Sequence, residues 1–217
     1  MTLSEENYLK AIYHLGRDAK GAISTNAIAE VMATKASSVT DMIKKLADKG
    51  LVKYKRYQGA NLTEDGRLYA ISVIRKHRLW ELFLVEKLNF SWDEVHDVAE
   101  QLEHVKSDKL IEELDAFLDF PSVDPHGDPI PDKDGNIQAS AKVLLATLKT
   151  GEKGVCVGVK NSSRAFLQYL DRLEVSLGKE LTVLGKEPFD NSIAIRVGDT
   201  FIHISSLAAN NLYVKKL

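Results

Sequence analysis

Two short segments of this sequence carry side chains that bind metal ions, at spacings that place them on common helix faces. Residues three or four apart share one face of an α-helix, so the ligands within each segment project toward the same side. The ligands offer nitrogen and oxygen but no sulfur, which favours a divalent ion such as Mn(II), Fe(II), Co(II) or Zn(II). The six side chains are His77, Glu81, His96, Glu100, Glu103 and His104.

The clustering of these groups in the sequence favours metal binding over a role as ordinary surface pairs. A single pair such as His77 and Glu81 is more often a surface pair one helical turn apart than a set of ligands. Here, however, four of the six histidines of the chain fall between residues 77 and 126. We therefore interpret the two segments as a metal site on neighbouring helices.

Composition excludes several classes of protein. With 217 residues, of which 44% are hydrophobic, the chain is long enough for two or three packed domains. Its single cysteine, Cys156, cannot form an internal disulfide, which favours a reducing, cytoplasmic setting. The polar start of the chain is not typical of a signal peptide, and no apolar run is long enough to cross a membrane. We expect a cytoplasmic protein without a membrane partner.

The first third of the chain has the pattern of a winged helix-turn-helix. Ser4 is placed to cap the first helix, and Gly50 follows the third as a stop signal. A basic stretch with a turn at Gly59 then predicts a short hairpin. The expected elements are helices over residues 4–15, 24–32 and 37–49 and a hairpin over residues 52–62.

Charge supports DNA binding by this module. Residues 1–78 hold 14 Lys and Arg against 8 Asp and Glu, a net charge of +6, whereas the remainder carries −8. In a winged helix-turn-helix the second helix of the motif enters the major groove and the wing follows the backbone. The alternative is a solvated helix face beside an ordinary hairpin. The expected DNA contacts are Lys35, Ser37, Ser38, Thr40, Lys44, Lys45, Lys55 and Arg56.

Three further helices and a small β-domain are expected after the wing. Thr63 is placed to cap a long helix that reaches about Leu88, Ser91 opens the next helix with a capping box, and Ser107 opens a third. The long helix is apolar on more than one face near its end, which predicts a dimer interface. Prolines and glycines make residues 121–135 a linker. Short strands beginning near Val155, Leu181, Ile193 and Phe201, with a helix over residues 164–173, predict a small barrel.

Four motifs together make the chain resemble the diphtheria toxin repressor family of iron- and manganese-dependent transcriptional repressors. They are Tyr8-Leu-Lys-Ala-Ile-Tyr, Arg75-Lys-His-Arg-Leu, Glu103-His-Val-Lys-Ser-Asp and Pro125-His-Gly-Asp-Pro-Ile-Pro. The resemblance covers nearly the whole chain and implies a mainly α fold with a small β-domain. It implies a winged helix-turn-helix over residues 1–73, a helical metal-binding and dimerisation domain over 74–139, and an SH3-like (FeoA-like) barrel over 140–217.

The resemblance divides the ligands into two sites. Iron-type members place Cys and Met in the regulatory site, where this chain has Glu100 and Asn7, so Mn(II) is favoured over Fe(II). Manganese-type members usually have Asp where this chain has Asn7, whose amide carries no charge. Zn(II) or Co(II) could substitute in vitro. The implied regulatory site is Asn7, Glu100, Glu103 and His104, and the implied ancillary site is His77, Glu81, His96, Asp124 and His126.

The function implied is that of a metal-activated, homodimeric repressor that binds double-stranded operator DNA and controls metal homeostasis. An Fe(II)-dependent repressor is the alternative within the family. No catalytic residue and no small organic substrate is expected. A metal-dependent phosphoester hydrolase is the alternative from another class, but it would leave the DNA-binding module unexplained. A metal-independent winged-helix regulator is the third possibility.

Overall fold

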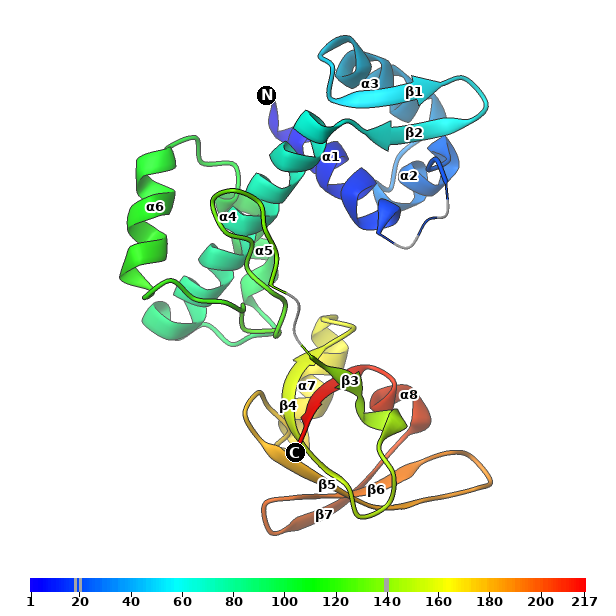
Figure 1. Cartoon of the computed structure of the whole chain (residues 1–217), viewed down its shortest axis with the longest axis vertical. Coiled ribbons are helices and arrows are strands. Elements are labelled where there is room, and N and C mark those ends of the chain that lie inside the picture. The colour runs from blue at the N-terminus through cyan, green and yellow to red at the C-terminus, as the bar shows by residue number, and fades with distance from the viewer. Residues whose placement is uncertain (18, 20, 139–140) are drawn as a thin grey trace. The chain divides into compact units, whose positions relative to one another are not determined.

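The computed structural model describes residues 1–17, 19, 21–138 and 141–217 (Figure 1). The first third is three helices followed by a two-stranded antiparallel hairpin, as predicted for a winged helix-turn-helix. Ile28, Val39, Ile43 and Leu46 are fully buried in its core. The elements are α1 (Leu3–Gly16), α2 (Thr25–Val31), α3 (Ala36–Asp48), β1 (Val52–Lys55) and β2 (Gly59–Leu62).

The first helix begins earlier than predicted. Thr2, and not Ser4, is the N-cap: the Thr2 hydroxyl accepts a hydrogen bond from the Glu5 backbone N–H at 3.3 Å, and the Glu5 carboxylate accepts one from the Thr2 N–H at 2.8 Å. This reciprocal capping box satisfies two amides at once, so it outcompetes a lone serine. The predicted stop after α3 is present, since Gly50 has a φ of +73°.

Helix α4 (Glu64–Leu88) is continuous over 25 residues and is capped by Thr63, whose hydroxyl accepts from the Gly66 N–H at 3.1 Å. It is followed by α5 (Val95–Leu102) and α6 (Asp108–Phe117). Half of the predicted capping box is present: the Glu94 carboxylate accepts from the Ser91 backbone N–H at 3.3 Å, but the Glu94 N–H donates to the Ser91 carbonyl oxygen at 3.1 Å and the Ser91 hydroxyl donates to the Glu94 carboxylate at 2.8 Å. These bonds close a turn, and α5 begins only at Val95. Within the described ranges, no helix is long and apolar enough to cross a membrane.

The predicted linker is an ordered loop. Over residues 121–135 the described chain forms neither helix nor extended strand, although Val123 and Pro129 form an isolated bridge. The Asp124 carboxylate accepts hydrogen bonds from the backbone N–H groups of His126 at 2.8 Å and Asp128 at 3.0 Å. These bonds hold the tip of the loop in one conformation, because an Asp side chain that accepts from its own chain mimics a backbone turn.

The last part of the chain is a six-stranded antiparallel sheet in the order β3-β8-β4-β5-β6-β7, with the two helices α7 (Arg164–Arg172) and α8 (Ser206–Ala209) and the short 3₁₀-helix η1 (Leu145–Thr147). The four predicted strands and the predicted helix are present. Two strands were not predicted, β3 and β8, and they pair with one another. The strands are β3 (Val143–Leu144), β4 (Lys153–Val159), β5 (Glu180–Lys186), β6 (Ile193–Val197), β7 (Thr200–Ile204) and β8 (Leu212–Lys216).

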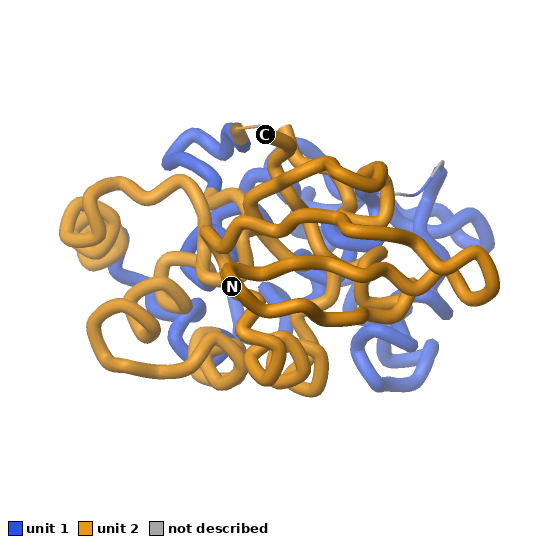
Figure 2. Tube along the Cα trace, turned by 90° about the horizontal axis from the view of Figure 1, so that it is seen from below, with its two compact units in different colours: residues 1–77, 100–108, 131–137 blue, residues 78–99, 109–130, 138–217 orange. Residues whose placement is uncertain are grey.

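The chain divides into two compact units (Figure 2). Unit 1 comprises residues 1–77, 100–108 and 131–137, and unit 2 comprises residues 78–99, 109–130 and 138–217. The boundaries fall inside the helices α4, α5 and α6, and after residues 130 and 137 in segments without regular structure. The division into three domains at residues 73 and 139 stays a prediction, and its second boundary, between residues 139 and 140, lies outside the described residues.

Candidate metal centre

Glu103 is the centre of a buried polar cluster in unit 1. Its side chain is fully buried just after the end of α5. The Lys10 ammonium, from α1, lies 2.7 Å from Oε1 and 2.9 Å from Oε2 of Glu103. Nδ1 of His77, from α4, lies 2.7 Å from Oε2. Burial acts to raise the pKa of Glu103, but the His77 hydrogen bond and the charge of Lys10 outweigh it and hold the pKa below its usual value. Glu103 is therefore an anion.

His104 is held so that one ring nitrogen faces Glu103. Nδ1 of His104 lies 2.5 Å from Oε2 of Glu6, and Nε2 lies 3.6 Å from Oε1 of Glu103. The hydroxyl of Tyr69 donates to Oε1 of Glu6 at 2.8 Å. A carboxylate on one nitrogen of an imidazole orients the ring and raises the basicity of the other nitrogen, as it does for metal-bound histidines. Glu6 was not among the site residues predicted from the sequence, so this role was missed.

The environment of the Asn7 side chain indicates most directly whether a cation fits at this site. Its Oδ1 atom is buried and has no hydrogen-bond partner among the described residues. A buried polar atom left in this state costs about 1–3 kcal/mol. An oxygen that accepts no hydrogen bond from the described residues keeps its lone pairs available to donate to a metal ion. Glu100, half exposed on α5, lies 3.4 Å from the Lys10 ammonium, so that ammonium contacts both carboxylates of the expected regulatory site.

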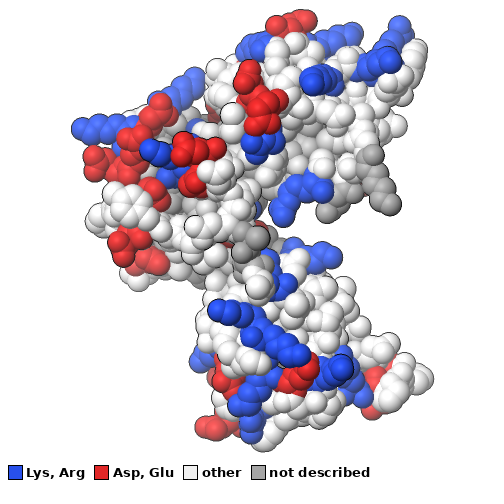
Figure 3. Space-filling model, viewed as in Figure 1, with Lys and Arg blue, Asp and Glu red and all other residues white. Residues whose placement is uncertain are grey.

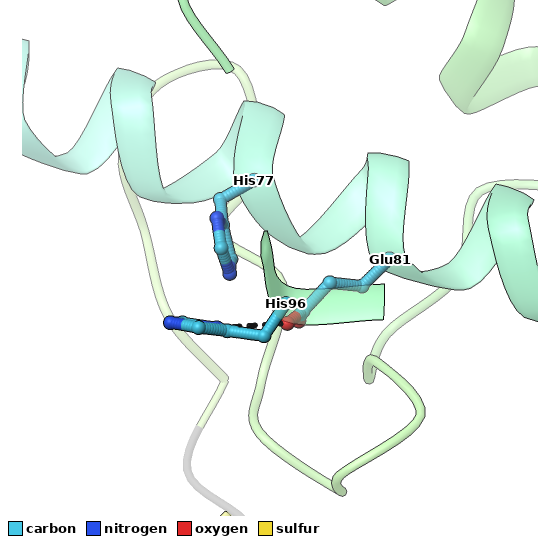
Figure 4. Close-up of side chains that lie close together, drawn as sticks. All are labelled: His77, Glu81 and His96. Atoms are coloured by element: carbon cyan, nitrogen blue, oxygen red, sulfur yellow. Dashed lines mark hydrogen bonds and ion pairs between the residues drawn. The ribbon is translucent and has the colours of Figure 1, made fainter. Parts of the chain in front are cut away.

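A second cluster lies in unit 2. Glu81, Asp124 and His126 are all buried, and each offers a ligand atom within 4.8 Å of the other two. Oε2 of Glu81 lies 3.6 Å from Nδ1 of His126, and Oε1 lies 3.4 Å from Nδ1 of His96. His77, one turn before Glu81 on α4, forms a second such group with Glu81 and His96 (Figure 4). Asp124 and His126, expected only from the resemblance, are thus brought beside Glu81.

The second cluster combines buried carboxylates with a histidine, and this arrangement of charge suits a bound cation. Burial, Glu81 and Asp128 raise the pKa of Asp124 to about 6, although Arg78 acts in the opposite direction. Burial acts to lower the pKa of His126, but the hydrogen bond and charge of Glu81, with the charge of Asp124, outweigh it and raise that pKa to about 9. A protonated histidine therefore balances the buried carboxylates. A divalent ion would replace that proton, because a metal-ligating histidine must be neutral.

Strand β4 braces the loop that carries His126. The Val159 N–H donates to the His126 carbonyl oxygen at 3.0 Å. The ring of His126 stacks on Trp92 with centroids 6.3 Å apart, and its Nε2 donates to the Trp92 carbonyl oxygen at 2.7 Å. Gly127 has a φ of +79°, and a Cβ at this position would lie 1.9 Å from the Val157 carbonyl oxygen. A glycine is therefore required here.

The expected DNA contacts lie on α3, on the residue before it and on the hairpin. Figure 3 shows Lys and Arg side chains over the surface where these elements lie. All eight predicted residues are exposed except Thr40, which is half-buried and donates to the Ala36 carbonyl oxygen at 2.9 Å. Lys45 is engaged elsewhere as well: its ammonium lies 3.1 Å from the buried carboxylate of Glu5, which Lys49 contacts at 2.7 Å. This link between α1 and α3 was not foreseen.

Three family profiles match successive parts of the chain. They are described as the N-terminal DNA binding domain of iron dependent repressors (residues 1–60), the metal binding and dimerisation domain of the same repressors (63–132) and the FeoA domain (143–216). The solved structure of a manganese-dependent transcriptional repressor in complex with manganese is 36% identical, with 98% of this chain and 100% of that chain covered and a TM-score of 0.85. The chain belongs to the diphtheria toxin repressor family.

Other relatives agree with this membership. An uncharacterized helix-turn-helix regulator of Methanocaldococcus jannaschii is 37% identical over 119 residues, which are 55% of this chain and 95% of the relative. The iron-dependent repressor IdeR of Mycobacterium tuberculosis (strain H37Rv) is 36% identical over 126 residues, or 58% of this chain. The match spans about half (54%) of that repressor. A crystal structure of ScaR with bound Zn²⁺ is 34% identical, covers 98% of this chain and 99% of that one, and has a TM-score of 0.77. Members of this family are metal-dependent transcriptional repressors and not enzymes.

Proposed function

We propose that this chain is a Mn(II)-activated repressor that binds operator DNA as a homodimer. The observation that carries the proposal is the buried Oδ1 of Asn7, which has no hydrogen-bond partner among the described residues and lies on the helix that also reaches Glu103. The donor set of Asn7, Glu100, Glu103 and His104 contains only nitrogen and oxygen, which suits Mn(II) better than softer ions. Two similar solved structures are those of a manganese-dependent transcriptional repressor and of the manganese regulator SloR, which supports this choice.

These four side chains would hold the regulatory ion, which supplies a divalent positive charge that joins donors from two segments. Asn7 lies on α1, whereas the other three donors lie between residues 100 and 104. Glu81, His96, Asp124 and His126, with His77, would form the ancillary site. His77 also bonds to Glu103, the carboxylate at the centre of the regulatory donor set.

Helix α1 is the element through which the regulatory site can act on DNA binding. Asn7 and Lys10 lie on its metal-site side, while Glu5 forms ion pairs with Lys45 and Lys49 of α3. A change in the position of α1 therefore reaches the recognition helix through Glu5. Metal activates DNA binding only to the extent that it prefers the DNA-competent position of α1.

Dimerisation is proposed for the apolar groove of unit 2, which encloses about 570 Å³. Phe117 is 64% exposed and Leu110 42% exposed, and Trp80, Phe83 and Leu114 complete the apolar lining. Large exposed aromatic side chains that line one groove are typical of a protein interface. Two copies joined here would present two winged modules to successive turns of cytoplasmic DNA.

The test is a metal series on a defined DNA probe. A duplex is first selected from a random pool by binding to the chain in Mn(II), and it is then titrated under anaerobic conditions with Mn(II), Fe(II), Co(II) or Zn(II). The proposal expects Mn(II) to activate binding at a lower free concentration than Fe(II) does. Activation at lower Fe(II) would favour the iron-dependent alternative. DNA affinity that a chelator leaves unchanged would support a metal-independent regulator instead.

A further inference from the structure

Lys10 is a buried cation in contact with two of the expected metal ligands. Its side chain is only 16% exposed. Its ammonium lies 2.7 Å and 2.9 Å from the two oxygens of Glu103 and 3.4 Å from Oε1 of Glu100. Among the described residues, no other amino group contacts Glu103, although His77 also bonds to it. Lys10 thus contacts the same carboxylates that would bind a metal ion at the regulatory site.

The bonding capacity of Glu103 makes this contact a competition. A carboxylate offers about four lone-pair positions on two oxygens. Oε2 already accepts from His77 and Lys10, and Oε1 accepts from Lys10 and faces Nε2 of His104. An ammonium and a divalent ion at the same oxygens would also repel one another strongly in a buried site. Glu103 and Glu100 therefore favour binding either the Lys10 ammonium or the metal ion, but not both at once.

We propose that Lys10 is a tethered cation that neutralises Glu103 and Glu100 in the metal-free chain and withdraws when the metal binds, so that it sets the metal concentration needed for activation. This inference rests on the proposed regulatory site. Without a counter-charge, the fully buried carboxylate of Glu103 would destabilise the metal-free fold. Lys10 removes that penalty, and the same contact weakens metal binding because it must be broken first.

A cavity beside Lys10 has room for its ammonium group when that group leaves the carboxylates. A cavity of about 440 Å³ in unit 1 is lined by Lys10 together with Asn7, His14, Met32 and Glu100, among others. Lysine has a flexible stem with a compact, strongly hydrated ammonium, so it can leave a carboxylate by rotation of its own side chain. Withdrawal into this open cavity exposes the ammonium to water without any movement of the backbone of α1.

The experiment measures Mn(II) binding to the full chain from the EPR signal of free Mn(II). The Lys10→Gln variant should bind Mn(II) at least about tenfold more tightly than the wild type, because one competing charge has been removed. In the absence of metal it should melt at a lower temperature, and Mn(II) should raise its melting temperature more than that of the wild type. Lys10→Arg keeps the charge and should stay near the wild type. Lys153→Gln removes an equal charge that pairs with the exposed carboxylate of Glu180, and it should leave Mn(II) binding unchanged.

The outcomes separate this inference from the proposed function. Equal or weaker Mn(II) binding by a folded Lys10→Gln variant would overturn the role of Lys10 and leave the repressor proposal standing. A wild-type chain that binds no Mn(II) would overturn the proposed function itself. If Lys10→Gln does not fold without metal, the Lys10→Met variant, which keeps the apolar stem, is refolded in Mn(II). A chelator should then remove Mn(II) from Lys10→Met more slowly than from the wild type. An equal or faster transfer would overturn the inference.

Discussion

At the scale of single residues, the two carboxylates of the proposed regulatory site differ in burial. Glu103 is fully buried and is held by Lys10 and His77, whereas Glu100 is half exposed and touches Lys10 only at 3.4 Å. Both are expected ligands with the same charge. The burial of Glu103 makes it essential to stability as well as to metal binding, because a buried ion pair that loses one partner leaves an uncompensated charge.

The two glutamates should therefore separate stability from metal binding. We expect Glu103→Gln to abolish Mn(II)-activated DNA binding and to lower the free energy of unfolding of the metal-free chain by about 2–3 kcal/mol. Glu100→Gln should weaken activation but keep the free energy of unfolding within about 0.5 kcal/mol of the wild type. Urea denaturation and DNA titration measure the two effects. Full activation of a Glu103→Gln dimer would remove Glu103 from the site.

At the scale of elements, the loop of residues 121–130 depends on strand β4 for its conformation. The contact between Gly127 and the Val157 carbonyl oxygen leaves no space for a Cβ, and the backbone of the neighbouring residue, His126, is bonded to Val159. A residue that widens this contact must displace the loop, and with it a ligand of the proposed ancillary site.

Gly127→Ala tests this dependence. We expect a loss of about 2–3 kcal/mol in the free energy of unfolding, from positive φ and from steric overlap, and the loss of one of two bound Co(II) ions. Gly151→Ala is the matched control, since Gly151 has a φ of +84° but nothing within 4 Å of its Cβ position. Visible Co(II) absorption reports the ions bound. Two retained ions in Gly127→Ala would show that the loop does not position the site.

The link between α1 and α3 predicts an acid dependence of stability. The hydrogen bond from Lys49, the Thr2 amide and the charge of Lys45 lower the pKa of Glu5 to about 2, from an unfolded value of about 4.3. Because the folded pKa is the lower one, Glu5 stabilises the fold above about pH 4.3, and this contribution is lost as the pH falls toward 2.

Glu5→Gln should consequently be less stable than the wild type at pH 7, and the difference should shrink between pH 5 and pH 2. Urea midpoints measured across this range provide the comparison. Glu64→Gln is the control, because Glu64 is an exposed partner of Arg67 and should change stability little at any pH. A Glu5→Gln difference that is constant with pH would mean that the ion pairs with α3 do not stabilise the folded chain.

At the scale of the whole molecule, the proposed function depends on a second copy of the chain. The unit 2 groove presents Phe117 at 64% exposure, with a tilted ring contact to Phe83 at 6.2 Å between centroids. The net charge of −8 after residue 78 leaves the DNA-binding charge to the first third of the chain. Two winged modules bind DNA together only when the dimer holds them, so dimerisation and DNA affinity should change in parallel.

Phe117→Ser should raise the dimer dissociation constant at least about tenfold, because aromatic anchors carry much of the binding energy of an interface. DNA affinity in Mn(II) should fall with it. Phe189→Ser is the control, since Phe189 is 93% exposed in the loop between β5 and β6, outside the groove. Sedimentation equilibrium measures the dimer. An unchanged dimer would place the interface elsewhere.

Local pattern was sufficient for most of the fold. Helical spacing of apolar residues, Thr63 as a cap and Gly50 as a stop predicted the winged module and the long helix, because these signals act within a few residues of the chain. The N-cap of α1 was placed two residues late, at Ser4 instead of Thr2, and α5 begins after its predicted cap. The strands β3 and β8 were missed because the first has only two residues and the second pairs mainly with distant β4.

The sequence by itself determined the kinds of ligand and which of them share a helix face, since spacing along a helix decides that directly. Only the tertiary structure decided what meets those faces. Lys10 and Glu103 are 93 residues apart, and His104 and Glu6 are 98 apart. No local pattern relates such positions, because their contact depends on how whole helices pack. That packing buries Glu103, leaves Asn7 Oδ1 without a partner among the described residues, and places a lysine against the carboxylates proposed to hold the metal.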